Sequence, residues 1–437
     1  MFTVPIWLYY PLTIICQFLT LLIFSNLIFY TILSLFGLKT PKRNYELVDP
    51  KRTFLFIIPA HNEELVITES IQSMYKQNYP KELFDIVCVA DNCTDGTVEA
   101  AKKAGAIVYE NKSGLSDPRG KPHGIANYLD YNGRDWRKYD YVTFIDADNY
   151  VDSNYLREMN SQLEAFPNLT VIQGYLGIKN VFSSLTATGY AAVYYITNRA
   201  VQYAKQTLGW NAAIGGTGFI LSTEYLEEFG WNPRSYTEDF ELQVELAIKG
   251  KKTSWNHWAK IYDEKPNTWK ASHNQRKRWA QGHWYVGITK TPAQIKGLVQ
   301  SKSVTCFLTR LETLMYSYSM VRPIAFLIIG LLVLMDSHFW LHFPGLFSLL
   351  PFWVALQILN FGIIPFVYCF QEGSNDFESK VFLTHKVRFM IRLLACFLWN
   401  SFTYAIVQII GFFTWHFPQN KWVKTEHTMG VDKHVEK

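Results

Sequence analysis

Residues 141–148 read YVTFIDAD, a short apolar run that ends in two aspartates. Three similar runs precede it, at residues 54–59, 85–90 and 106–109. Stretches with a helical pattern separate these runs, and such alternation is typical of βαβ units and a parallel sheet. The sequence therefore predicts an α/β fold. Ligands of such sheets bind beyond the carboxyl ends of the strands, where Asp91 and Asp146 stand.

Asp146 and Asp148 stand two residues apart, directly after the fourth predicted strand. Hard oxygen ligands at such a turn suit Mg²⁺ or Mn²⁺ held jointly with the phosphates of a substrate. Two aspartates at a strand end also often form turns or cap helices. Residues 91–97 (DNCTDGT) are equally well explained as an Asx turn with an N-cap. Both interpretations stay open on these residues alone.

Two further clusters carry charges that suit a phosphorylated ligand or proton transfer. Arg119 and Lys121 flank the start of a helical stretch, which is an anion site in geometry and charge, although a solvated basic loop has the same pattern. Thr237, Glu238 and Asp239 precede an amphipathic run. One of the two carboxylates caps that helix, and the other could accept a proton in a cleft that raises its pKa.

Residues 275–279 (QRKRW) place cations beside an indole. An arginine can hold a diphosphate through two parallel hydrogen bonds, and the face of Trp279 can stack on a sugar ring. A basic segment with a tryptophan anchor at a membrane surface has the same composition. The segment therefore predicts either a ligand contact or a membrane contact.

Several classes of function are disfavoured. Residues 215–218 (GGTG) precede a strand-like run and not a helix, so they match neither the dinucleotide fingerprint nor the phosphate loop. The net charge is only +5, from 42 basic and 37 acidic residues, and no long basic run occurs. Nucleic acid is therefore not an expected partner. The six cysteines form neither a CxxC pair nor a zinc spacing, and we interpret them as buried small hydrophobes.

Charged residues make up 18% of the chain and are concentrated in its middle. No Asp, Glu, Lys or Arg occurs before Lys39, at residues 337–371 or at residues 393–420. Since about 20 apolar residues span a bilayer, residues 6–38 predict one membrane span with an apolar lead-in, or a tight pair of spans. Basic residues follow this span at once, and the positive-inside tendency then places the amino terminus outside and the central body in the cytoplasm.

Three more apolar stretches cover residues 315–335, 339–370 and 393–415. The second contains Pro344, Gly345 and Pro351 and is expected to bend or re-enter. Residues 380–392 carry basic residues at helical spacing and predict an amphipathic helix on the cytoplasmic surface, or a basic loop at a membrane edge. The predicted organisation is a transmembrane segment at 1–38, a cytoplasmic domain at 39–290, and interfacial and transmembrane helices with a tail at 291–437.

Seven motifs, taken in their order along the chain, resemble those of the membrane-integrated family 2 glycosyltransferases, which include synthases of cellulose, chitin, hyaluronan and poly-N-acetylglucosamine. They are residues 59–64 (PAHNEE), Asp91 within residues 90–97 (ADNCTDGT), Gly120-Lys121 with Ala126-Asn127, Asp146-Ala147-Asp148, Gly216-Thr217-Gly218, Thr237-Glu238-Asp239, and Gln275-x-x-Arg278-Trp279. The resemblance covers residues 54–284. It implies a glycosyltransferase domain of A type, with a mostly parallel sheet flanked by helices, joined to an α-helical transmembrane region.

The resemblance also implies a role for each matching residue. Those expected to bind the nucleotide sugar are Pro59, Ala60, Glu63, Asp91 at the uracil, Lys121 and Arg278 at the diphosphate, and Asp146 near the ribose. Asp148 would ligate Mg²⁺ or Mn²⁺, and Asp239 would be the catalytic base. Those expected to contact the acceptor are Gly216, Thr217, Gly218, Gln275 and Trp279.

The activity that the resemblance implies is inverting, metal-dependent transfer of a hexose from UDP-N-acetylglucosamine or UDP-glucose to a growing β-linked polysaccharide. Translocation through a multi-pass cell-membrane region would follow, with accessory export subunits as further partners. The alternative is a non-processive enzyme that adds one or a few sugars to a membrane lipid. A non-catalytic scaffold is disfavoured because the central carboxylates are all present. Residues 422–425 (WVKT) are similar to a motif that relatives keep at the cytoplasmic face, which favours an even number of downstream crossings.

Overall fold

The computed structural model describes residues 6–114, 117–130, 135–335, 344–376 and 379–419. Its centre is an eight-stranded sheet in the order β3-β2-β1-β4-β7-β6-β8-β5. The strands are β1 (Phe54–Ala60), β2 (Phe84–Asp91), β3 (Ile107–Asn111), β4 (Tyr141–Phe144), β5 (Tyr150–Val151), β6 (Val171–Ile178), β7 (Phe219–Ser222) and β8 (Thr253–Asp263). All four runs that the sequence predicts as strands are strands, and the α/β class is confirmed.

The sheet is mixed. Strands β3, β2, β1 and β4 run parallel, and β6 and β8 run parallel to each other. Strand β7 is antiparallel to both of its neighbours, β4 and β6. Because β7 runs against β4, its first residues and the glycines that precede it lie beside the carboxyl end of β4. This arrangement brings residues 215–218 next to Asp146.

Helices cover both faces of the sheet with apolar side chains. On one face pack α2 (Ile67–Tyr75), α3 (Thr97–Lys103) and α5 (Tyr155–Ala165). On the other face pack α4 (Lys121–Asp130), α8 (Thr223–Phe229) and α9 (Glu238–Lys249). The helix expected after residues 62–64 begins three residues later, at Ile67.

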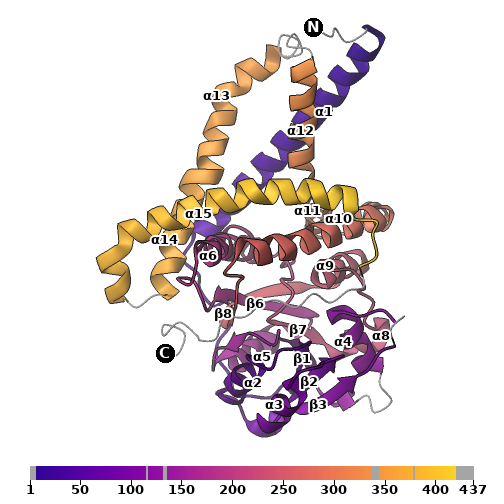
Figure 1. Ribbon diagram of the computed structural model, residues 1–437, viewed down its shortest axis with the longest axis vertical. Helices are drawn as coiled ribbons and strands as arrows, with labels where there is room; N and C mark the ends of the chain where they lie inside the picture. The colour runs from indigo at the N-terminus through magenta and orange to yellow at the C-terminus, as the bar shows by residue number, and fades with distance from the viewer. Residues whose placement is uncertain (1–5, 115–116, 131–134, 336–343, 377–378, 420–437) are drawn as a thin grey trace.

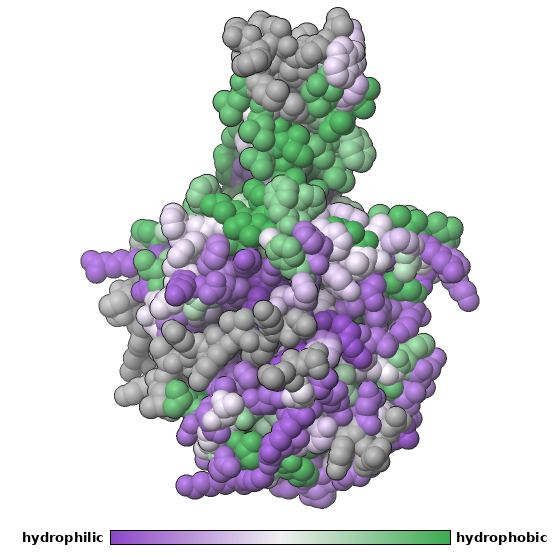
Figure 2. All heavy atoms as spheres, turned by 45° about the vertical axis from the view of Figure 1, so that its right-hand side comes forward, coloured by the Kyte–Doolittle hydropathy of each residue, from purple (hydrophilic) through white to green (hydrophobic). Residues whose placement is uncertain are grey.

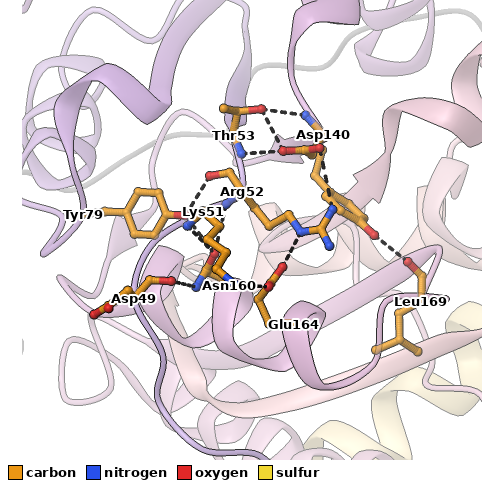
Figure 3. Close-up of polar contacts among 10 residues, drawn as sticks. Asp49, Lys51, Arg52, Thr53, Tyr79, Asp140, Asn160, Glu164 and Leu169 are labelled. Carbon is orange, nitrogen blue, oxygen red and sulfur yellow. Dashed lines mark hydrogen bonds and ion pairs between the residues drawn. The ribbon is translucent and has the colours of Figure 1, made fainter.

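The segment between the first helix and β1 is held to α5 by polar contacts (Figure 3). The Asn160 side chain accepts from the backbone N–H groups of Lys51 and Arg52, at 3.0 and 3.1 Å, and the Glu164 carboxylate accepts from the Arg52 Nε at 2.8 Å. The two bonds to Asn160 satisfy backbone N–H groups that have no strand neighbour there. They fix where the chain enters the sheet.

The apolar ends of the chain form a column above this body. It contains α1 (Ile6–Leu35), α12 (Val321–Met335) and α13 (Pro344–Ile358) (Figure 1), and its visible surface is apolar (Figure 2). Within the described ranges, three segments are long and apolar enough to cross a membrane: Trp7–Leu38, Pro351–Gly373 and Arg388–Thr414. Helices α11 (Val304–Ser317) and α12 together pass the same test but are bent by 51°.

The region after residue 335 departs in two ways from the predicted pattern. Helix α13 continues through Pro351, and the irregularity falls later, in a π-helical turn at Leu359–Ile363 before α14 (Ile364–Asp376). The amphipathic segment and the last apolar stretch form one helix, α15 (Ser379–Thr414). Residues 336–343 and the tail motif at 422–425 lie outside the described residues.

Helix α15 lies crosswise to the column and rests on the α/β body (Figure 1). Its inner face packs on α6 (Leu185–Thr197) and α10 (Trp269–Val299), so closely that a Cβ on Gly411 would stand 2.6 Å from that of Ala280. Its outer face exposes large apolar side chains: Ile391, Leu398, Trp399, Phe402, Ile406 and Phe413. The helix therefore has a protein side and an apolar outer side.

Two buried ion pairs join the body to the C-terminal helices. The Arg199 guanidinium, in a π-helical turn at Asn198–Tyr203, meets the Glu372 carboxylate of α14 at 2.7 Å and also donates to the Gly37 carbonyl after α1. The Lys205 ammonium meets the Glu312 carboxylate of α11 at 2.6 Å. All four side chains are at most 2% exposed. A buried charge requires such a partner.

Candidate active site

A cleft of about 230 Å³ opens at the carboxyl ends of β1, β4 and β8, where α4, α9 and α10 meet. The residues expected from the sequence that line it are Pro59, Glu63, Lys121, Asp146, Asp148, Gly216, Thr217, Asp239, Gln275, Arg278 and Trp279. They come from positions almost 220 residues apart in the chain. Parallel strand ends and the antiparallel β7 bring them to one edge of the sheet.

Three expected residues lie behind the cleft wall and not in it. Asp91 is 1% exposed and accepts hydrogen bonds from the side chains of Asn111 and Asn92, at 2.6 and 2.9 Å. Ala60 is fully buried. At Gly218, φ is +64° and a Cβ would stand 2.7 Å from the Ile261 side chain. Asp91 and Gly218 thus shape the turns behind the cleft.

Lys121 is the cation at the centre of the cleft. Its ammonium lies 2.7 Å from the Asp146 carboxylate and 3.0 Å from the Glu238 carboxylate, and it donates to the Gly216 carbonyl at 2.6 Å. Burial opposes its charge, but the two carboxylates outweigh burial and raise the pKa of Lys121. This network links β4, α9 and the glycine segment before β7. Any anionic ligand of this ammonium would compete with both carboxylates.

Asp239 stands in the first turn of α9 and faces the cleft. Partial burial, reinforced by the adjacent Glu238 carboxylate, raises its pKa from 3.8 to about 7. A Cβ on Gly216 would stand 3.3 Å from an Asp239 carboxylate oxygen, and Gly216 has φ +79°. Glycine at position 216 therefore leaves free space beside this carboxylate. A carboxylate with such a pKa, beside open space, is suited to accept a proton near pH 7.

Residues 275, 278 and 279 share one face of α10. Among the described residues the Arg278 guanidinium pairs with no carboxylate, and its Nε is buried with no hydrogen-bond partner. Burial lowers the pKa of Arg278 without removing its charge near neutral pH, since arginine stays protonated. Trp279 contacts Tyr190 edge to face, with ring centroids 6.2 Å apart. Arg278 is thus available to an anionic ligand, and so is Arg119, which also lines the cleft and has a buried Nε without a hydrogen-bond partner in the described part of the chain.

The two aspartates after β4 are held in different ways. The Asp146 carboxylate faces Lys121, and its backbone N–H donates to the Thr217 hydroxyl at 3.0 Å. One Asp148 oxygen accepts from the Asn149 side-chain amide at 2.9 Å. No group of three or more His, Cys, Asp or Glu that could hold a metal occurs within the described parts of the chain. Asp148 offers the hard oxygen donor that Mg²⁺ or Mn²⁺ prefers, and such ions commonly complete their shell with phosphate and water.

Several lining residues carry no motif in the sequence. Asp263, at the end of β8, forms a short ion pair with Lys265, and the Lys265 ammonium also lies 4.7 Å from the centre of the Tyr194 ring. Gln419, after α15, accepts from the Tyr236 backbone N–H at 2.9 Å and lines the cleft. A polar side chain at the end of a long strand is the signal that could have found Asp263. Gln419 reaches the cleft only through the packing of α15, which no local pattern reveals.

Comparisons with known proteins agree with this geometry. Residues 50–282 match the family model described as "Glycosyltransferase like family 2". The "Probable glycosyltransferase YdaM" of Bacillus subtilis is 26% identical over 258 residues, which are 57% of this chain and 59% of the relative. The "Poly-beta-1,6-N-acetyl-D-glucosamine synthase" of Staphylococcus aureus is 26% identical over 240 residues, 54% of this chain and 55% of the relative. The match thus spans little more than half the length of these curated relatives.

A solved structure shares the fold. The mannosyltransferase of Pyrobaculum calidifontis, in complex with GDP-Man and Mn²⁺, aligns with a TM-score of 0.52 at 18% identity, over 89% of this chain and 99% of that one. The family match covers more than half of the chain and contains the strand ends and the carboxylates of the cleft. The chain therefore belongs to glycosyltransferase family 2, and its catalytic body has the A-type fold of nucleotide-sugar transferases.

Proposed function

We propose that this enzyme transfers a hexose from a UDP-sugar, UDP-N-acetylglucosamine or UDP-glucose, to an acceptor hydroxyl with inversion at the anomeric carbon. The observation that carries the proposal is the pairing, in one cleft, of a carboxylate of raised pKa with an arginine that lacks a carboxylate partner among the described residues. Asp239 is the proton acceptor, and Arg278 binds the diphosphate.

The reaction is a single displacement. Asp239 takes the proton of the acceptor hydroxyl as its oxygen forms a bond to the anomeric carbon, and the bond from that carbon to the diphosphate oxygen breaks. The electron pair of that bond leaves with UDP, whose growing negative charge Arg278 and Lys121 stabilise. Lys121 exchanges part of its contact with Asp146 and Glu238 for the phosphate. No covalent enzyme intermediate forms.

Asp148 would hold Mg²⁺ or Mn²⁺ in this scheme. When bound, the ion supplies positive charge that stabilises the departing diphosphate. The relevant features of this chain are the oriented Asp148 carboxylate and its position in the same cleft as Arg278. The Mn²⁺ in the mannosyltransferase complex is consistent with this proposal.

The membrane placement proposed here puts the column of α1, α12 and α13 in the bilayer and α15 flat on its cytoplasmic surface. The outer apolar face of α15 and its packing on α6 and α10 support this placement. If α12 and α13 cross the bilayer and α15 does not, the described part of the chain after the body crosses it an even number of times. The segment after α15, which brings Gln419 to the cleft, is then on the same side as the cleft.

The acceptor that we favour is a membrane lipid whose head group lies at the bilayer surface. We expect three helices to be too few to enclose a polymer channel, which favours a lipid acceptor. The rival function is processive synthesis of a β-linked polysaccharide. It is supported by the similarity to the poly-β-1,6-N-acetyl-D-glucosamine synthase of Staphylococcus aureus and by the Gln275-x-x-Arg278-Trp279 motif. That function requires further helices, from a second copy or an export subunit.

One experiment tests both levels of the proposal. The purified full chain, in membranes with extracted lipids, is incubated with a panel of radiolabelled UDP-sugars, and UDP release and product size are measured. We expect a mono- or oligoglycosyl lipid from one UDP-hexose, and no product from the Asp239→Asn variant. A product of polymer length would replace the lipid proposal by the processive one. Equal UDP release by wild type and variant would refute Asp239 as the base.

A further inference from the structure

A second cavity, of about 490 Å³, lies at the opposite end of β8 from the active-site cleft. We call it the α9–α11 cavity because the end of α9 and the first turns of α11 line it, together with Thr253 and Ser254 at the start of β8. None of its lining residues lines the active-site cleft. Eleven strand residues separate the two ends of β8, a distance of about 30 Å. The cavity is therefore not a part of the nucleotide-sugar site.

The charged residues of this lining are all basic: Lys251, Lys252 and Arg310. The Arg310 guanidinium is fixed by the carbonyls that end α9, with its Nε 2.9 Å from the Ala247 oxygen and its Nη2 3.0 Å from the Ile248 oxygen. Carbonyl oxygens at a helix end carry only a partial negative charge, so they offset the positive charge of Arg310 only in part. Among the described residues no carboxylate pairs with Arg310.

Both lysines remain available to an anionic ligand. Lys251 meets the Glu228 carboxylate at 2.9 Å, but the two side chains are 31% and 52% exposed, and such an exposed pair is weak. Lys252 is exposed at the edge of the same cavity. The cavity therefore has a positive potential and amide and hydroxyl groups, from Asn44, Asn211, Ser254 and Thr305, for further hydrogen bonds.

The cavity lies where the polar body meets the apolar helices. In Figure 1, α11 stands at the foot of the column, next to α12. Trp210, in the lining, stacks on Phe29 of α1 with ring centroids 6.0 Å apart. Val304, which lies between the lining residues Ser303 and Thr305, is 75% exposed. An apolar surface next to a basic cavity is the pattern expected where acyl chains and phosphate head groups adjoin.

We propose that the α9–α11 cavity binds the head group of an anionic phospholipid. Its phosphate would be held by Lys251 and Lys252 within the field of Arg310, and the apolar residues at the mouth would contact the acyl chains. The volume is within the range of small-ligand sites, and basic pockets beside transmembrane helices at the cytoplasmic surface bind such head groups. The bound lipid would tie the end of α9, whose first turn holds Asp239, to the membrane surface.

The test uses the full chain, delipidated and reconstituted in nanodiscs of phosphatidylcholine with or without phosphatidylglycerol. We expect phosphatidylglycerol to raise the Tm of the wild type. The Lys251→Gln/Lys252→Gln variant should lose most or all of that rise. The matched control is Lys102→Gln/Lys103→Gln, which removes the same charge from α3, at the end of the body far from the column (Figure 1). The control should keep the full rise.

Two further measurements keep the proposal refutable. Native mass spectrometry should show phosphatidylglycerol retained by the wild type and by the control but not by the lysine variant or by Thr305→Trp, which fills the cavity without changing its charge. Equal retention of phosphatidylglycerol by all four proteins would refute a specific site. So would a loss of lipid from the control as complete as that from the lysine variant. A Tm rise with soluble glycerol phosphate as large as that with phosphatidylglycerol would show a soluble ligand and refute the lipid. None of these results depends on transferase activity.

Discussion

Replacing Asp239 by Asn is expected to abolish transfer and, at the same time, to stabilise the folded protein at alkaline pH. The carboxylate stands in the first turn of α9 beside Glu238, and its pKa is raised to about 7. A native state that raises the pKa of an acid binds its proton more tightly than the unfolded chain does. The stability of the wild type therefore falls as the pH rises from about 4 to about 7. Asparagine has no proton to lose, so the variant does not share this fall.

The size of the effect follows from the two pKa values. The difference between 3.8 and about 7 corresponds to roughly 4 kcal/mol of unfavourable ionisation, at 1.36 kcal/mol per pKa unit. Asp239 is partly exposed at the cleft wall, and water there screens its charge, so we expect about 2 to 4 kcal/mol. Loss of a general base lowers the rate by about 10² to 10⁴. The variant should thus be more stable and nearly inactive.

The assay is thermal unfolding of both purified proteins in the same detergent between pH 5 and pH 8.5, with UDP release measured on the same samples. At pH 5 the variant should already unfold at a slightly higher temperature than the wild type, and the difference should widen to a few degrees between pH 5 and pH 8.5. For the wild type, kcat/KM should rise with pH and reach half of its plateau near pH 7. A Tm difference that does not widen with pH, or an activity profile flat between pH 6 and pH 8, would refute the assigned environment of Asp239.

Three other predictions concern the donor, the metal and the packing of α15. The Arg278→Ala substitution should raise the KM for the UDP-sugar by roughly 10- to 100-fold, because charge-assisted hydrogen bonds are lost. Lys277 does not line the cleft, so Lys277→Ala should leave the KM unchanged. A larger effect at Lys277 than at Arg278 would contradict the site. Chelation of divalent ions should stop transfer, and added Mn²⁺ or Mg²⁺ should restore it; full activity in excess chelator would exclude a role of Asp148 as metal ligand. A Cβ added at Gly411 would stand 2.6 Å from the Ala280 Cβ, so the Gly411→Leu variant should be less stable by about 1 to 3 kcal/mol in thermal unfolding. The Gly330→Leu variant should keep its stability, because a Cβ there would meet open space.

The catalytic body was largely predictable from sequence because its residues sit at strand ends. Asp146 directly follows an apolar run, and Asp239 directly precedes an amphipathic one. The βαβ pattern requires the carboxyl ends of parallel strands to meet. The reversal of β7 was not predictable from its own residues, since a four-residue apolar run has no direction. That reversal places Gly216 beside Asp239.

The membrane region was less predictable because hydropathy does not distinguish a span from a helix that lies on a protein. Residues 388–414 pass the length and apolarity test for a span. Their inner face nevertheless packs on α6 and α10, where Asn400 accepts a hydrogen bond from Arg276 and Trp284 donates to the Gln408 carbonyl. Such contacts join residues more than 120 positions apart. Only the folded arrangement shows them.

The two buried ion pairs have a practical consequence for laboratory work. A shortened protein that stops after residue 290 would lack Glu372 and Glu312, and Arg199 and Lys205 would then have no counter-charges. The same cut would uncover the apolar sides of α6 and α10 on which α15 rests. Such a fragment would expose a large apolar surface to water and tend to aggregate during expression. Crystals, binding assays and inhibitor screens are therefore best attempted with the intact chain in detergent or lipid.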